Sequence, residues 1–140
     1  MRDLQATAEA LLADLVGFPS VTGTPNGAIV GYIKDYLENL NIPVRIDAHE
    51  DGERFNLFAT IGPQIDGGIV LSGHTDVVPA NSAGWTGDPF TLRKQDGRLY
   101  GRGAVDMKGC LAIALALAPL FKQAEDELRL PLDYAFVCDE

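Results

Sequence analysis

The sequence is poor in cysteine and has no long hydrophobic run. It holds two cysteines, Cys110 and Cys138, in 140 residues, which is too few for a disulfide framework. Both lie in apolar stretches, so we expect buried, reduced thiols in a cytoplasmic protein. The longest apolar run, 110–121, is shorter than the roughly 18 residues that cross a bilayer. The N-terminal segment is interrupted by acidic residues, which is not typical of a signal peptide.

Positive charge is also scarce. Eleven Lys and Arg residues face 20 Asp and Glu residues, for a net charge of −9, and the basic residues are scattered singly. A nucleic acid or an anionic membrane surface would be repelled by such a chain. We therefore expect neither as a partner.

The hydrophobic pattern predicts one α/β domain. Apolar residues at helical spacing predict a helix over 3–16 and a second helix that Asn26 caps. The apolar segment 67–73 predicts an interior strand, and Asp96-Gly97 predicts a hairpin. The segment "DMKGCLAIALALAPLF" predicts a largely buried helix that ends or kinks near Pro119. Further strands are predicted at 42–48, 55–62 and 132–138. The order of elements predicts helices packed on a mixed sheet.

Polar residues cluster where predicted strands and helices meet. His74 and Asp76 follow one strand, Asp139 and Glu140 follow the last strand, and Asp106 precedes the buried helix. Ligands gather at the carboxyl ends of strands in such sheets. Each cluster also has a purely structural explanation: a turn cap for His74 and Asp76, a helix N-cap for Asp106, and a solvated loop for the acidic pair.

Taken together, the clusters favour a site for zinc or a similar divalent ion, since imidazole and carboxylate groups are its usual ligands. Asp76 could itself be a ligand, or it could orient the ring of His74. The ligand count is short, because the other histidine, His49, lies in a polar loop that we expect at the surface. The chain also stops just after a strand. Both features suggest a longer polypeptide.

Four segments carry a resemblance to a known family. "SGHTDVVP", then Trp85 with "DPF", then "DGRLYGRGAVDMKG", then "CDE" resemble the N-terminal signature of the zinc aminoacylase and exopeptidase family, of M20 type. The resemblance covers essentially the whole chain. It implies a three-layer zinc-exopeptidase-like catalytic domain with a mixed central sheet, truncated. Residues 1–140 would be its N-terminal portion, without the rest of that domain and without the dimerisation domain.

The resemblance also implies a role for each site residue. His74 would ligate one zinc, Asp76 would orient His74, and Asp106 would bridge two zincs, with a cis peptide bond to Met107. Glu140 would be the general base of amide hydrolysis. Cobalt is the alternative metal. The glutamate that follows Glu140 in the family, and a later histidine, are not in this sequence, so we expect the 140-residue chain alone to be inactive.

Within the family, the segments look most like those of members that remove the acetyl group from N-acetylornithine, in arginine biosynthesis. Members that remove a succinyl group from diaminopimelate, and dipeptidases, remain alternatives. The implied partner is a small N-acylated amino acid, and the full-length protein is expected to be a homodimer. A hypothesis from a different class is a truncated, non-catalytic binding module, which the incomplete ligand set would favour.

Overall fold

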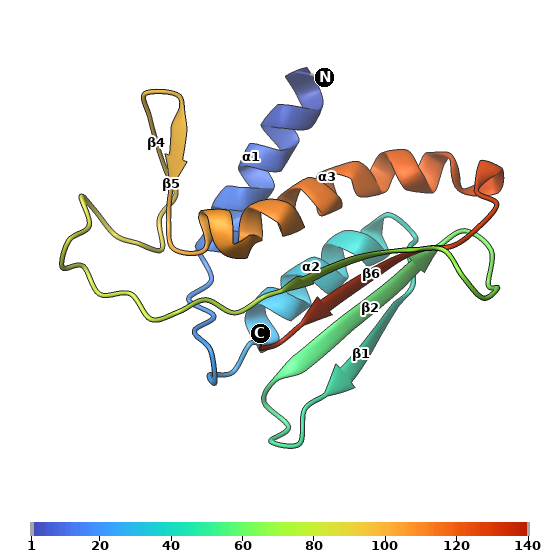
Figure 1. Ribbon diagram of the computed structural model, residues 1–140, viewed down its shortest axis with the longest axis horizontal. Helices are drawn as coiled ribbons and strands as arrows, with labels where there is room; N and C mark the ends of the chain where they lie inside the picture. Colours follow the sequence, from blue (N-terminus) through green and yellow to red (C-terminus); the bar gives the residue numbers. More distant parts are fainter. Residues whose placement is uncertain (1, 140) are drawn as a thin grey trace.

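The computed structural model describes residues 2–139 (Figure 1). The order of helices and strands is the predicted one. The elements are α1 (Arg2–Val16), α2 (Gly27–Asn39), β1 (Val44–Ala48), β2 (Phe55–Ile61), β3 (Ile69–His74), β4 (Arg93–Gln95), β5 (Arg98–Tyr100), η1 (Ala104–Lys108), α3 (Gly109–Gln123), η2 (Glu125–Glu127) and β6 (Leu132–Val137).

Four of the strands form a mixed sheet in the order β1-β2-β6-β3. The first two pairs are antiparallel, whereas β3 and β6 run parallel, with His74 opposite Val137. The parallel pair matters for function, because it brings the carboxyl ends of two strands to the same edge of the sheet. The α/β class and the mixed sheet are confirmed.

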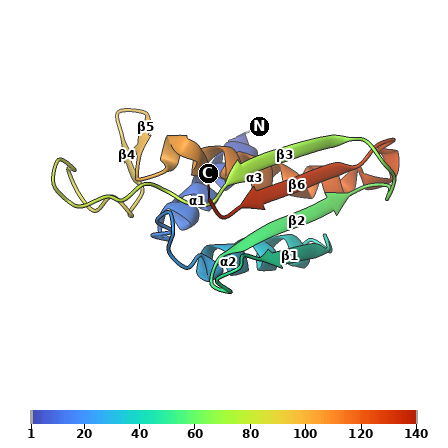
Figure 2. The same ribbon diagram turned by 60° about the horizontal axis from the view of Figure 1, so that its bottom comes forward.

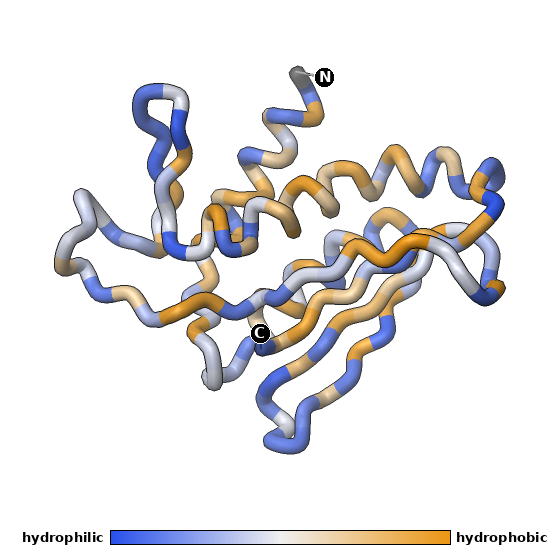
Figure 3. The backbone as a smooth tube through the Cα atoms, in the orientation of Figure 1, coloured by the Kyte–Doolittle hydropathy of each residue, from blue (hydrophilic) through white to orange (hydrophobic). Residues whose placement is uncertain are grey.

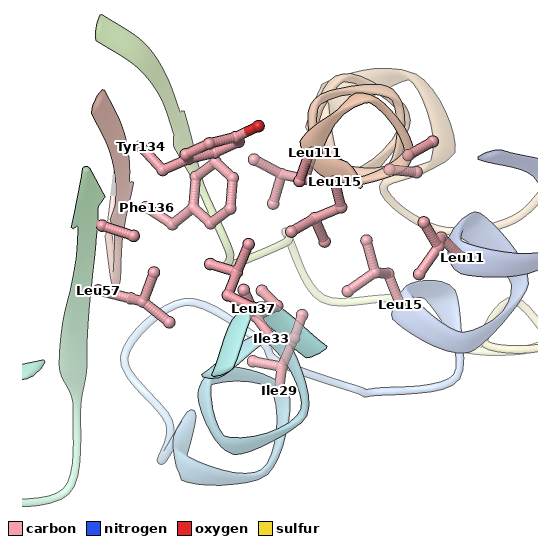
Figure 4. Close-up of a cluster of buried hydrophobic side chains, with 14 of the residues drawn as sticks. Leu11, Leu15, Ile29, Ile33, Leu37, Leu57, Leu111, Leu115, Tyr134 and Phe136 are labelled. Carbon is pink, nitrogen blue, oxygen red and sulfur yellow. The ribbon is translucent and has the colours of Figure 1, made fainter. Parts of the chain in front are cut away.

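The core lies between the sheet and the helices on one face of it (Figure 2). Alternate residues of β2 and β6 are buried, as expected for strands with one covered face. Side chains from α1, α2 and α3 meet them, as Figure 4 shows. The hydroxyl of Tyr134 donates to the carbonyl of Ala114 at 3.0 Å, and that of Tyr36 donates to Leu115 at 3.1 Å. These two bonds tie α3 to the sheet and to α2.

The position of β3 differs from the prediction. An interior strand was expected, but within residues 2–139 β3 pairs only with β6 and forms an edge of the sheet. Ile69 and Val70 are 65% and 57% exposed, and Figure 3 shows their hydrophobic stretch along β3. An apolar run predicts that a strand is suited to burial, but it does not identify the neighbour that buries it.

Two features of α3 differ from the prediction. Of the two alternatives given for Pro119, an end of the helix is wrong, because α3 continues to Gln123 with Pro119 inside it. Cys110 is exposed rather than buried, because it lies on the outer side of the first turn while Leu111 and Ala112 point into the core. Cys138 is buried, as predicted. Periodicity was weak in this segment, since nearly every residue is apolar and the pattern cannot identify the buried face.

One stretch, Ala104–Gln123, has the length and apolar composition of a membrane-crossing helix, with a hydropathy of 1.7. A helix buried in a protein core passes the same test. Here Leu111, Leu115 and Ala118 are buried against the other helices and the sheet. Packing within the domain accounts for these apolar residues, whereas Ile113 and Leu120 in the same stretch are exposed.

The β4–β5 hairpin is the predicted one. Asp96 and Gly97 connect the two strands, and both have positive φ, 51° and 74°. That pair of values is typical of the type I′ turn that an Asp-Gly sequence favours. The hairpin leads directly into the segment that holds Asp106.

Candidate metal centre at the carboxyl ends of β3 and β6

His74 is the last residue of β3, and Asp76 follows two residues later. Both are buried. The backbone is held to β6, because the N–H of Thr75 donates to the carbonyl of Val137 at 2.9 Å. Gly73 allows the strand to approach the start of α3, since a Cβ there would lie 2.6 Å from a methyl carbon of Leu111. The local sequence thus places His74 at the junction of strand, helix and loop.

Asp106 reaches the same place from another direction. The chain turns at Gly103, which has φ 79° and where a Cβ would lie 2.4 Å from Val77. Asp106 then lies in an irregular turn with a cis peptide bond to Met107, as the family resemblance implied. Its side chain is 78% exposed. Asp106 is not the N-cap of α3, a position that Lys108 occupies.

The ring of His74 lies between the two aspartates. Its Nδ1 is 3.0 Å from the backbone carbonyl of Asp76 and 3.1 Å from the Asp76 carboxylate. Its Nε2 is 3.1 Å from Oδ1 of Asp106. A carbonyl oxygen only accepts, so Nδ1 carries a proton in this contact and Nε2 faces Asp106. This is the tautomer in which Nε2 can ligate a metal.

The charge state of His74 reflects the same neighbours. Burial of the ring opposes a positive charge, but the Asp76 carbonyl and the carboxylates of Asp106 and Asp76 outweigh it and raise the pKa of His74. The two carboxylates therefore create a site that favours a cation. A proton on the ring or a metal ion beside it would both satisfy this environment.

A cavity of about 410 Å³ opens beside these groups. Thr22, His74, Asp76 and Asp106 line it together with Arg102. Sequence reasoning singled out neither Thr22 nor Arg102, because one lies in a loop read only as a connection and the other in a glycine-rich turn. The free space is large enough for a small organic molecule.

The other acidic residues are not all at this centre. The Asp139 carboxylate accepts from the guanidinium of Arg54 and from the N–H of Gly23, at 3.3 Å in the second case, so it is not a merely solvated residue. Glu140 lies outside the described residues. His49 is exposed, as predicted. Within residues 2–139, no group of three or more His, Cys, Asp and Glu side chains could hold a metal.

The residues that are present nevertheless fit zinc as a partial ligand set. Two ligands on one tetrahedral zinc lie about 3.3 Å apart, given bonds of about 2 Å. Nε2 of His74 and Oδ1 of Asp106 are 3.1 Å apart. An imidazole nitrogen and a carboxylate oxygen are also donor types that zinc prefers. The described residues therefore supply two candidate ligands, fewer than the four of a tetrahedral zinc site.

Comparison with known proteins relates this centre to a family of hydrolases. Residues 70–140 match the model for Peptidase family M20/M25/M40. The chain is 39% identical over 112 residues to an acetylornithine deacetylase of Proteus mirabilis, an alignment that covers 75% of this chain. It is 42% identical over 112 residues to a succinyl-diaminopimelate desuccinylase of Legionella pneumophila, covering 79% of this chain. The alignments cover 29% of each relative.

The fold matches a solved structure of the same kind. The crystal structure of an M20 family metallo-carboxypeptidase from Sulfolobus solfataricus superimposes with a TM-score of 0.79 at 22% identity. The match covers 93% of this chain and 30% of that one. The chain thus spans about 30% of the length of these three proteins.

Proposed function

Because the chain belongs to peptidase family M20/M25/M40, we propose that it is the N-terminal part of the catalytic domain of a metal-dependent hydrolase that cleaves amide bonds. The observation that carries the proposal is the placement of His74 Nε2 3.1 Å from Asp106 Oδ1, at the wall of a cavity of about 410 Å³. Zinc is the proposed metal, with cobalt as the alternative.

Each residue has a proposed role. His74 and Asp106 hold the metal, and Asp76 keeps the proton on Nδ1 of His74 so that Nε2 faces the metal position. When bound, the metal would polarise an amide carbonyl and make a water molecule more acidic. Glu140 is proposed as the base that takes a proton from the attacking water and gives it to the departing amine.

The proposed substrate is N-acetylornithine, which would give ornithine and acetate. The 39% identity to an acetylornithine deacetylase supports this choice. The 42% identity to a succinyl-diaminopimelate desuccinylase supports succinyl-diaminopimelate as the second candidate. Assembly into a homodimer and a cytoplasmic location stay predictions.

The test is an assay of amide hydrolysis. It uses the full-length protein from the natural gene, because this chain spans only 29% of the length of these relatives. N-acetylornithine, succinyl-diaminopimelate and a dipeptide would be compared, each with zinc and with a chelator. Turnover that the chelator abolishes supports the proposal, and the preferred compound identifies the substrate. Absence of both turnover and bound zinc would instead support a non-catalytic binding module.

The chain offers a matched pair of histidines for the metal. We expect His74→Ala to lose bound zinc by elemental analysis, whereas His49→Ala keeps it, because His49 lies in an exposed turn. Glu140→Ala should keep zinc and lose turnover. Equal zinc content in His74→Ala and His49→Ala would refute the proposed ligand. Substantial turnover by Glu140→Ala would refute the proposed base.

A further inference from the structure

The loop 17–26, between α1 and α2, runs alongside the segment that follows β3. Val21 and Val77 form an isolated parallel bridge. The N–H of Val77 donates to the carbonyl of Ser20 at 2.9 Å, and the N–H of Thr22 donates to the carbonyl of Val77 at 3.0 Å. These bonds fix the backbone of the loop relative to Val77, the residue that follows Asp76.

Side chains add to this attachment. The hydroxyl of Ser20 donates to the carbonyl of Thr75 at 2.7 Å, and both residues are buried. Asn26 has no capping bond to α2. It donates instead to the Phe55 carbonyl at 2.9 Å and to Thr75 Oγ1 at 3.3 Å. Asn26 is at the N-cap position of α2, as predicted, but its side chain bonds Phe55 and Thr75 instead of the N–H groups of the helix. The loop and the segment 74–77 form one hydrogen-bonded unit.

Thr22 makes the contact that bears on the site. Its Oγ1 donates to Oδ2 of Asp76. The other oxygen of that carboxylate, Oδ1, forms an ion pair with Nδ1 of His74 at 3.1 Å and makes no hydrogen bond among the described residues. One oxygen of Asp76 is thus held by the loop while the other is turned toward the ring.

The buried cation nearby does not replace this contact. The amine of Lys108 is aimed at the carbonyl of Phe18, to which it donates at 2.7 Å. It acts on Asp76 through its charge. A charge without a directed hydrogen bond stabilises the ionised form but does not select one rotamer of the carboxylate. Orientation of Asp76 therefore depends on the Thr22 hydroxyl.

We propose that Thr22 is a positioning residue of this centre, whose hydroxyl holds the carboxylate of Asp76 in the one orientation that faces Nδ1 of His74. The consequence for metal affinity rests on the proposed function, whereas the orientation of Asp76 does not. Partners of this kind behind a ligating histidine commonly change metal affinity tenfold or more when they are removed.

The chain supplies variants that separate hydrogen bonding from packing. Thr22 is exposed as a residue, so the isosteric Thr22→Val removes the hydroxyl without leaving a buried cavity. Thr22→Ser restores the donor. Thr24→Val is the control, since Thr24 is an exposed threonine of the same loop whose hydroxyl donates to Val21, away from Asp76.

The first measurement uses the metal-free 140-residue chain. Three-bond couplings to the Asp76 carboxyl carbon report its χ1 rotamer by NMR. We expect one rotamer in the unsubstituted chain, in Thr22→Ser and in Thr24→Val, and averaging over rotamers in Thr22→Val. A single unchanged rotamer in Thr22→Val would overturn the proposal, as would averaging in the unsubstituted chain.

The second measurement is the zinc affinity of the full-length protein from the natural gene, determined by competition with a chromophoric chelator. Thr22→Val should bind zinc roughly tenfold more weakly, with Thr22→Ser and Thr24→Val unchanged. Equal affinity in all four proteins would overturn the role of Thr22 at the metal. If the unsubstituted protein binds no zinc, the proposed function fails, and the rotamer measurement alone decides the proposal for Thr22.

Discussion

The two carboxylates that flank His74 lie in opposite environments. The side chain of Asp76 is 5% exposed, whereas that of Asp106 is 78% exposed. The Asp76 flank is enclosed by the loop 17–26 and by Lys108. The Asp106 flank is an irregular turn that also exposes Val105, at 89%. Both carboxylates are nevertheless within about 3 Å of the same ring.

The difference in exposure indicates that Asp76 and Asp106 have different roles. A buried carboxylate with a directed donor has little freedom, so it can hold a neighbouring ring in one orientation. An exposed carboxylate at the mouth of a cavity can be reached by an ion from solvent. The comparison therefore predicts that the two flanks respond differently to substitution. A change at the Asp76 flank should lower stability as well as metal affinity, whereas a change at the Asp106 flank should lower metal affinity alone.

The largest effect on stability is expected from Asp76→Ala. The substitution leaves the Thr22 hydroxyl only its longer contact to the Val77 carbonyl, at 3.3 Å, and removes the negative charge near the buried amine of Lys108. Losing one member of a buried polar group of this kind costs about 2–4 kcal/mol. The free energy of unfolding would be measured by urea denaturation. A loss as small as that of an exposed residue would contradict the buried, constrained flank.

An intermediate effect, dependent on pH, is expected from Lys108. Burial lowers the pKa of Lys108 to about 8, and the charge of Asp76 opposes this only in part. In the unfolded chain the amine keeps its ordinary pKa near 10.5. Between these values the unfolded chain binds more protons, so the contribution of Lys108 to the free energy of unfolding rises with pH, by about 3 kcal/mol.

The variant Lys108→Met tests whether this contribution rises or falls with pH. The free energy of unfolding of the unsubstituted chain minus that of Lys108→Met should be constant below about pH 8 and rise toward pH 10.5. Lys94→Met is the control, because Lys94 is exposed, and its difference should show no such rise. A difference for Lys108→Met that is flat, or that falls with pH, would contradict the buried, charged amine.

The smallest effect on stability is expected from Asp106→Ala. An exposed side chain in a turn contributes within about 0.5 kcal/mol, so urea denaturation should hardly distinguish this variant. Zinc binding by the longest natural protein should nevertheless weaken by roughly tenfold or more, if Asp106 is a ligand. A variant with normal zinc affinity would remove the functional difference between the flanks and leave only the difference in burial.

The sequence by itself determined the elements, their order and the candidate residues. Alternation along β2 and β6, helical spacing in α1 and α2, and the Asp96-Gly97 turn each follow from local chemistry, which a single segment contains. The positions of His74 and Asp76 at a strand end were predictable for the same reason. Asp106 was a candidate ligand from its position before the buried helix, whereas its cis peptide bond to Met107 was predictable only through the resemblance to a family.

Tertiary structure alone decided the contacts between distant segments. The edge position of β3, the outward face of Cys110 and the bonds of Asn26 to Phe55 and Thr75 depend on which neighbour each residue meets. A local pattern does not contain that information. The contact from Thr22 to Asp76 joins residues 54 positions apart in the sequence. Its loop reads as an ordinary connection, because Gly, Pro, Ser and Thr favour turns whether or not their hydroxyl groups serve a site. Only packing of that loop against the end of β3 turns a common residue into a partner of the centre.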